Sequence, residues 1–144
     1  MINKSSFKLS IIVPCYNEIN TIDEIISKIL ESLIRNNLNN YEIIIIDDSS
    51  TDGTVNKLKK METKDYFKII YHKNNQGKGA AIQTALNQIS GDIVLIQDAD
   101  LEYDPFDYNK LLLPFFETNA DVVYGSRFLG GGKYVRIHFF WHYL

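Results

Sequence analysis

The chain has 144 residues, a formal net charge of −3 and one cysteine. This length fits a single domain, and the lack of a basic block argues against a nucleic-acid partner, because binding to a phosphate backbone needs clustered Lys and Arg. A lone cysteine permits no intramolecular disulfide, and no segment has the roughly 18 apolar residues of a membrane-spanning helix. We therefore expect a soluble, cytoplasmic protein.

Continuous apolar runs alternate along the chain with segments of helical periodicity. Five runs predict buried strands, at Leu9–Pro14, Ile43–Ile46, Ile69–Tyr71, Ile93–Ile96 and Val122–Tyr124. Helices are predicted at Thr21–Asn36, after Gly53, at Gly79–Ser90 and from Pro105 onwards. Strands that are apolar throughout indicate a parallel sheet with helices on both faces. The pattern thus predicts a doubly wound α/β fold, in which ligands bind beyond the carboxyl ends of the strands.

Two of the predicted helices carry start signals. Thr21 and Glu24 have the spacing of a capping box. Asp104 followed by Pro105 fits an N-cap residue and the first helical position.

The first predicted strand ends in Pro14-Cys15-Tyr16-Asn17-Glu18. A dinucleotide-binding protein would carry Gly-x-Gly-x-x-Gly at this point, so that class is disfavoured. In a functional interpretation, Tyr16 offers a flat face to a nucleobase and Glu18 binds a ribose hydroxyl. An ordinary strand-to-helix turn explains the motif equally well.

The second predicted strand closes with Asp47 and Asp48, followed by Ser-Ser-Thr-Asp-Gly-Thr. A helix-capping loop accounts for the later half, because its Asp, Thr and Gly suit caps and turns. It leaves the paired acids unexplained. Acids at the end of a buried strand need hydrogen-bond donors, and the ring nitrogens of a nucleobase would supply them.

Gly77, Lys78 and Gly79 follow the third predicted strand. The two glycines allow the backbone to approach a ligand closely, and the helix that starts here favours an anion at its N-terminus. The spacing of a P-loop is absent, and taken alone the segment is more typical of a simple turn.

Asp98-Ala99-Asp100 follows the fourth predicted strand. Residues two apart along an extended chain point the same way, so the two carboxylates can face one point. Their repulsion is relieved by a hard divalent cation, Mg²⁺ or Mn²⁺, and Mg²⁺ completes its coordination with water and phosphate oxygens. The pair therefore predicts a phosphorylated ligand. The alternative is an acidic turn that caps the next helix.

Taken in order, five motifs resemble glycosyltransferase family 2, whose members are inverting enzymes of the GT-A fold. They are Val-Pro-x-Tyr-Asn-Glu, Asp-Asp-x-Ser-x-Asp-Gly-Thr, Asn-x-Gly-Lys-Gly-x-Ala, Asp-Ala-Asp-Leu-Glu and Gly125-Ser126-Arg127-Phe128. Within the family, the chain is similar to the dolichyl- and polyprenyl-phosphate mannosyl- and glucosyltransferases. The resemblance implies transfer of a hexose from GDP-mannose or UDP-glucose to a polyprenyl or dolichyl phosphate, with Mg²⁺ or Mn²⁺ as cofactor.

The resemblance also implies residue roles. It assigns nucleotide-sugar binding to Pro14, Tyr16, Glu18, Asp47, Asp48, Gly77, Lys78 and Asp98. Metal binding falls to Asp98, Asp100 and Glu102, and catalysis to Asp100 and Arg127. Arg127 fits a clamp for a diphosphate or an acceptor phosphate, because a planar guanidinium binds phosphate through two hydrogen bonds. Glu102 as an exposed turn acid and Arg127 as a surface charge are the alternatives.

We expect two parts, a nucleotide-sugar-binding GT-A core at 1–129 and the start of a truncated acceptor segment at 130–144. The latter is rich in aromatic and basic residues. These suit a lipid headgroup layer, so the resemblance implies peripheral contact with the cytoplasmic face of a membrane. Apolar residues exposed there would also favour a homodimer. The alternative is that the aromatic rings cover the sheet as ordinary core.

Three other functions fit part of the pattern. One is a family 2 transferase that acts on a hydroxyl of a cell-surface polysaccharide or glycolipid. Another is a nucleotide-sugar-binding module without turnover, if the acceptor half is missing. The third is a nucleotidyltransferase of related fold, but that class needs a glycine-rich basic loop where this chain has Pro14–Glu18.

Overall fold

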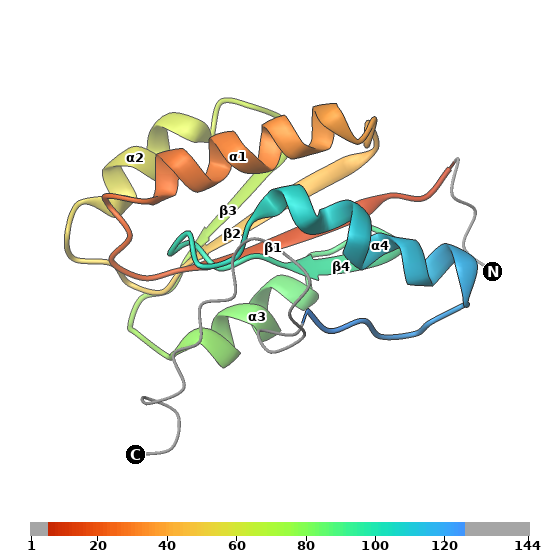
Figure 1. The fold of residues 1–144 in the computed structure, drawn as a ribbon. Coiled ribbons are helices and arrows are strands. Elements are labelled where there is room, and N and C mark those ends of the chain that lie inside the picture. Colours follow the sequence, from red (N-terminus) through yellow and green to blue (C-terminus); the bar gives the residue numbers. More distant parts are fainter. Residues whose placement is uncertain (1–5, 126–144) are drawn as a thin grey trace, which may run out of the picture.

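The computed structural model describes residues 6–125, which form a parallel sheet flanked by helices (Figure 1). Four strands lie in the order β3-β2-β1-β4, and within the described range they make up one sheet. The strands are β1 Leu9–Cys15, β2 Tyr41–Asp47, β3 Phe67–Tyr71 and β4 Ile93–Ile96. The helices are α1 Ile22–Arg35, α2 Thr54–Met61, α3 Lys78–Leu86, the short 3₁₀ helix η1 Pro105–Asp107 and α4 Tyr108–Glu117.

The register of the sheet determines where its carboxyl edge lies. β1 and β2 pair along their whole length and end level, with Cys15 opposite Asp47. The pairing of β1 with β4 stops earlier, at Ile12 opposite Ile96, and a hydrogen bond of 2.9 Å from the Gln97 N–H to the Ile12 carbonyl follows. Beyond this point β1 continues and the chain after β4 departs from it.

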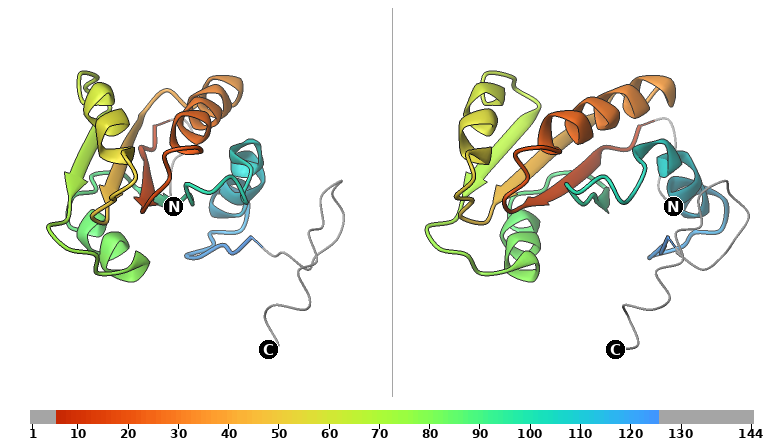
Figure 2. Two further views of the ribbon diagram at one scale, coloured as in Figure 1. Left: turned by 90° about the vertical axis from the view of Figure 1, so that its left-hand side faces the viewer. Right: turned by 60° about the vertical axis from the view of Figure 1, so that its left-hand side comes forward.

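Helices cover both faces of the sheet, as predicted. Residues of α1, α2 and α4 pack on one face, against Ile11 and Val13 of β1. α3 packs on the other face, where Ala81 and Ala85 contact the cluster that contains Ile12. Figure 2 shows α3 on the side of the sheet opposite to α1 and α2. Burial of each isoleucine stabilises the fold by roughly 1.5–3 kcal/mol, so the face covered by the larger side chains of α1 contributes more.

The prediction of a fifth strand at Val122–Tyr124 is wrong. This segment is irregular, and Val122 and Tyr124 are 62% and 87% exposed. A short apolar run becomes a strand only where a neighbouring edge and covering side chains bury it, because strand preference is mainly a preference for that environment. Within residues 6–125 the chain does not bring this run to the sheet.

The two helix-start predictions have different outcomes. Asp104 is an N-cap as predicted, since its side chain accepts a hydrogen bond of 3.0 Å from the Phe106 N–H. The prediction of a capping box is wrong, because the Thr21 side chain accepts no hydrogen bond from the start of α1 and its backbone has helical rather than extended angles. The Thr21 hydroxyl donates to the Glu18 carboxylate. Glu24 forms an ion pair with Lys28 at 2.9 Å.

At the amino ends of the strands, Glu42 is the centre of a polar network. Its Oε1 accepts hydrogen bonds of 2.6 Å from the Ser10 hydroxyl and 2.6 Å from the Ser90 N–H, and Lys8 Nζ lies 3.2 Å from Oε2. Burial raises the pKa of Glu42, but these hydrogen bonds outweigh burial and lower the pKa to about 2. The network therefore stabilises the ionised carboxylate far from the carboxyl edge.

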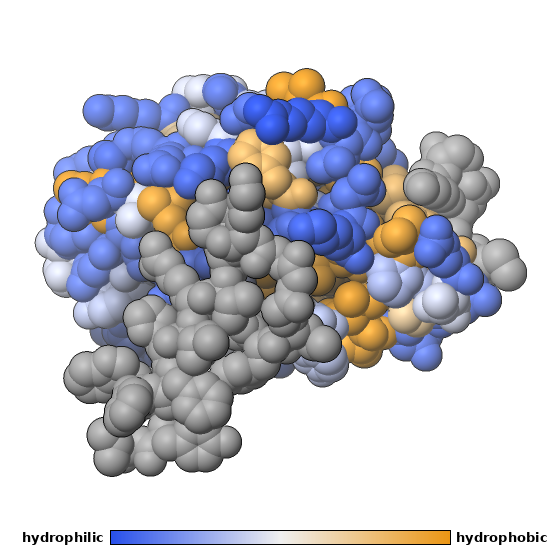
Figure 3. All heavy atoms as spheres, in the orientation of Figure 1, coloured by the Kyte–Doolittle hydropathy of each residue, from blue (hydrophilic) through white to orange (hydrophobic). Residues whose placement is uncertain are grey.

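The surface in Figure 3 is mainly hydrophilic, with separate small hydrophobic patches. Exposed large apolar residues include Ile34, Ile96 and Leu113. Among residues 6–125, the helices are all too short or too polar to cross a bilayer.

Candidate functional site

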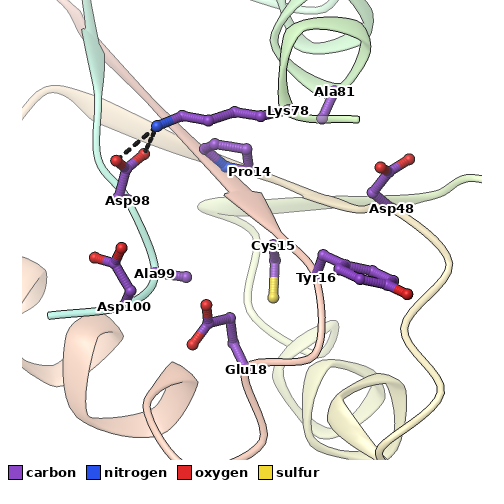
Figure 4. Close-up of a pocket in the computed structure, with 10 residues that line it drawn as sticks. All are labelled: Pro14, Cys15, Tyr16, Glu18, Asp48, Lys78, Ala81, Asp98, Ala99 and Asp100. Atoms are coloured by element: carbon purple, nitrogen blue, oxygen red, sulfur yellow. Dashed lines mark hydrogen bonds and ion pairs between the residues drawn. The ribbon is translucent and has the colours of Figure 1, made fainter. Parts of the chain in front are cut away.

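A cleft of about 170 Å³ opens at the carboxyl edge of the sheet, between the ends of β1 and β4 and the start of α3 (Figure 4). Complete small-molecule sites typically measure about 300–1,000 Å³, so this cleft is the size of part of such a site. All four polar motifs at the strand ends contribute to its lining. The lining residues are Pro14, Cys15, Tyr16, Glu18, Asp48, Lys78, Ala81, Asp98, Ala99 and Asp100.

The structure brings most of the predicted site residues together in this cleft, but not all of them. Asp47, Gly77 and Glu102 are not among the lining residues. Arg127 and the expected segment 130–144 lie outside the described residues. The roles of all these residues, including those in the cleft, stay predictions.

The loops after β1 and β2 hold each other through hydrogen bonds. The Asn17 N–H donates to Ser50 Oγ at 2.9 Å, and Asn17 Oδ1 accepts from the Thr51 N–H at 2.8 Å. The Glu18 N–H donates to Thr54 Oγ1 at 3.0 Å. Most polar residues that follow Asp48 in the second motif therefore shape the loops, although the N-cap position of α2 is Gly53, which has no side chain to cap this helix.

This loop arrangement leaves two side chains of the first motif at the cleft. Tyr16 lines the cleft and is 47% exposed, so part of its side chain is accessible to a ligand. The Glu18 carboxylate lines the cleft while accepting the hydrogen bond from Thr21. Burial, with Asp47 and Glu18 nearby, raises the pKa of the Cys15 thiol, which favours the neutral form of this buried cysteine.

Asp47 ends β2, is buried, and has one oxygen without a hydrogen-bond partner. The residue is 1% exposed, and its Oδ2 accepts a hydrogen bond of 3.1 Å from the Ser50 N–H. Its Oδ1 is buried and has no hydrogen-bond partner. A buried carboxylate oxygen without a donor is costly, and among the described residues Oδ1 is the one buried side-chain oxygen or nitrogen without a hydrogen-bond partner.

Asp48 organises the loop between β3 and α3. Its Oδ1 accepts from the Gln76 N–H at 2.9 Å and its Oδ2 from the Gly77 N–H at 2.7 Å, while His72 Nδ1 lies 2.7 Å from Oδ1. Burial raises the pKa of Asp48, but these hydrogen bonds outweigh burial and leave the pKa below its usual range. Asp48 is thus ionised, and its oxygens are engaged by the protein itself.

Lys78 and Asp98 form an ion pair across the cleft (Figure 4). Lys78 Nζ lies 2.6 Å from each oxygen of the Asp98 carboxylate. Lys78 begins α3, and Gly77 before it has φ +88°, a backbone conformation that glycine adopts without strain. The Lys78 ammonium thus contacts the Asp98 carboxylate, which the sequence predicts to bind a metal ion. Neither the sequence motifs nor their spacing revealed this pairing.

The acidic pair fits a metal ion that arrives with a phosphorylated ligand. Asp98 and Asp100 both line the cleft, and Asp100 Oδ1 also accepts a hydrogen bond of 3.0 Å from the Glu102 N–H. Within residues 6–125, no three His, Cys, Asp or Glu residues gather in a metal-binding group. Mg²⁺ and similar hard ions commonly use one or two carboxylates and take their other ligands from water and phosphate, so two carboxylates suffice.

Fold and site together define a doubly wound α/β domain with an acidic ligand site at the carboxyl edge of its sheet. Residues 10–143 match Glycosyl transferase family 2, and the chain belongs to this family. It is 34% identical over 129 residues to the dolichol-phosphate mannosyltransferase of Pyrococcus furiosus, covering 88% of this chain and 35% of that protein. It is 32% identical to the undecaprenyl-phosphate 4-deoxy-4-formamido-L-arabinose transferase of Proteus mirabilis, covering 83% of this chain and 36% of that protein.

Solved structures give the same result. The mannosyltransferase PcManGT from Pyrobaculum calidifontis, in complex with GDP-Man and Mn²⁺, is 32% identical with a TM-score of 0.59, over 69% of this chain and 29% of that chain. S. aureus TarS in complex with UDP-GlcNAc is 32% identical with a TM-score of 0.60, over 77% of this chain and 31% of that chain. The fold is therefore the GT-A fold, as predicted. The chain spans about a third of the length of these relatives.

Proposed function

We propose that the protein transfers a hexose from a nucleotide sugar, GDP-mannose or UDP-glucose, to a polyprenyl or dolichyl phosphate with inversion at the anomeric carbon. The observation that carries the proposal is that Asp98 and Asp100 line the same cleft as Tyr16 and Glu18. This arrangement would hold a diphosphate at the acidic pair and a nucleoside at the first motif. The names of the two relatives support a lipid-phosphate acceptor.

In this proposal each part of the donor meets a different group of residues. The base stacks on Tyr16 and turns its ring nitrogens toward Asp47, whose Oδ1 has no donor, while Glu18 binds the ribose. The Lys78 ammonium and the N-terminus of α3 face the diphosphate, since both favour an anion. Asp98 and Asp100 would hold Mg²⁺ or Mn²⁺, which neutralises charge on the leaving diphosphate when bound.

The transfer itself needs no general base from the protein. An oxygen of the acceptor phosphate is already an anion, and it attacks the anomeric carbon from the face opposite the diphosphate. A carbon–oxygen bond to the acceptor forms, the bond to the diphosphate breaks, and the nucleoside diphosphate leaves. Arg127 is the proposed clamp for a phosphate in this step. Peripheral contact with the cytoplasmic face of a membrane would bring the acceptor to the cleft.

Titration calorimetry with GDP-mannose and UDP-glucose, in Mn²⁺ and in excess chelator, tests donor binding. We expect binding of one donor that Mn²⁺ strengthens, followed by release of the nucleoside diphosphate when a polyprenyl phosphate is added. Asp107, an exposed acid outside the cleft that pairs with Lys110 at 2.6 Å, provides a control variant, Asp107→Asn. Binding of neither donor would refute the proposal, whereas binding without release would favour the non-catalytic module. Release of diphosphate ion would favour a nucleotidyltransferase.

A further inference from the structure

A buried polar chain links the ends of β2 and β3 to α3, and none of the sequence motifs includes its central residue. His72 follows β3, and its side chain is 7% exposed. Nδ1 lies 2.7 Å from Asp48 Oδ1, and Nε2 lies 2.9 Å from Thr84 Oγ1. The imidazole therefore bridges a carboxylate at the end of one strand and a hydroxyl on the helix that begins with Lys78.

The direction of the hydrogen bonds follows from the state of Asp48. An ionised carboxylate can only accept, so His72 Nδ1 carries the proton in this contact. Asp48 accepts in addition from the Gln76 and Gly77 N–H groups. The same carboxylate thus holds both the start and the end of the segment that leads from β3 to α3.

The polar chain matters because the apolar contacts of α3 with the sheet come from small or partly buried side chains, with Ile82 among the latter. The nine residues of α3 bury two alanines, Ala81 and Ala85, against the sheet. Alanine offers a single methyl group, and a helix of this length is marginal without tertiary contacts. The contacts of Asp48, His72 and Thr84 therefore add to these apolar contacts in holding α3 in register with the cleft.

We propose that His72 is a positioning residue of the donor site: it fixes α3 and its preceding loop to Asp48, and so determines where the Lys78 ammonium meets the cleft. The choice of a nucleoside diphosphate as the ligand rests on the proposed function. The positioning of α3 by His72 does not depend on it. Loss of the imidazole removes the link between Asp48 and Thr84 and leaves Asp48 held by the Gln76 and Gly77 N–H groups alone, so the N-terminus of α3 shifts relative to Asp98.

The test compares His72→Phe, which keeps a flat ring and removes both hydrogen bonds, with His72→Asn, whose amide can still donate to Asp48. Hydrogen exchange at the Gln76 and Gly77 amides and titration with GDP and UDP in Mn²⁺ are the measurements. We expect His72→Phe to lose most of the protection at the two amides and to weaken nucleotide binding about ten-fold. His72→Asn should regain most of both.

Ser10→Ala is the matched control, because Ser10 is fully buried and hydrogen-bonded to Glu42 at the opposite end of the strands. The two variants are compared under conditions where they lose the same amount of melting temperature. Ser10→Ala should then leave unchanged both the nucleotide affinity and the exchange protection of the Gln76 and Gly77 amides. If His72→Phe and Ser10→Ala affect affinity equally, or if His72→Phe leaves the amides protected, the inference is wrong. Hydrogen exchange uses no ligand, so failure of the wild-type chain to bind any nucleotide would refute the proposed function and leave the positioning of the loop testable.

Discussion

Replacing Lys78 with Gln should change metal binding and nucleotide binding in opposite directions. In the structure the Lys78 ammonium contacts both oxygens of Asp98 at 2.6 Å, so a divalent ion that uses Asp98 must first displace it. Without the lysine, Mn²⁺ alone should bind more tightly. The same substitution removes a cation from the proposed diphosphate site, so GDP and UDP should bind more weakly in the absence of metal.

The size of the effect follows from exposure. The Lys78 side chain is 57% exposed and that of Asp98 is 15% exposed, so water screens the pair on one side. Measured energies of exposed ion pairs are about 0.2–1 kcal/mol, and the partial burial of Asp98 favours the upper end. A gain of about 1 kcal/mol corresponds to Mn²⁺ binding about five-fold tighter. Added salt should reduce the difference, because screening weakens the competing ion pair.

Titration of Mn²⁺ by calorimetry or electron paramagnetic resonance would measure this change, with Lys73→Gln as the control. Lys73 is exposed and not among the lining residues of the cleft, and its substitution removes the same charge from the surface. Equal Mn²⁺ affinity in wild type and Lys78→Gln would refute the reasoning. An equal gain in Lys73→Gln would instead assign the effect to net charge.

Three further changes have defined outcomes. Asp100→Asn should abolish the strengthening of nucleotide-sugar binding by Mn²⁺ and spare metal-free binding; calorimetry that finds the Mn²⁺ effect intact would exclude Asp100 as a ligand. Asp47→Asn should weaken GDP or UDP binding by about 1–3 kcal/mol with its Mn²⁺ dependence retained, and an unchanged dissociation constant would count against the proposed base contact. Glu42 has a folded-state pKa of about 2 against an ordinary 4.5, so its contribution to stability is present above pH 4.5 and is lost as the pH falls towards 2. Urea unfolding across this range should show a shallower pH dependence in Glu42→Gln, and identical curves would contradict the network.

Local sequence signals predicted the elements but not the contacts between them. Hydrophobic runs identified the four strands, of which β1 and most of β2 are buried and the edge strands β3 and β4 are buried only in part. Asp104 could be recognised as an N-cap because its hydrogen bond is local. The prediction of a strand at Val122–Tyr124 fails because the burial of this run depends on neighbouring segments, which the local hydrophobic pattern does not describe.

Within the candidate site, the sequence located the four strand-end motifs, and the doubly wound fold explains why they meet. The pairing of Lys78 with Asp98 and of His72 with Asp48 could not be predicted, because these residues lie 20 and 24 positions apart. Only the order of the strands brings them into contact. A histidine at the end of a predicted strand, beside a strand that closes with paired acids, was the available signal for the second pair.

Pro14 explains why the pairing of β1 with β4 ends early. Along a strand, backbone groups point alternately to either side, and the Ile12 carbonyl points to the β4 side, where it meets the Gln97 N–H. The nitrogen of Pro14 therefore points to the same side, and it has no hydrogen to offer. Proline is tolerated in a central strand only where no ladder bond is required. Because Pro14 cannot donate a hydrogen bond, the backbone pairing of β1 with the segment after β4 ends here. The two segments then separate, and Asp98 and Asp100 lie on the segment that has left β1.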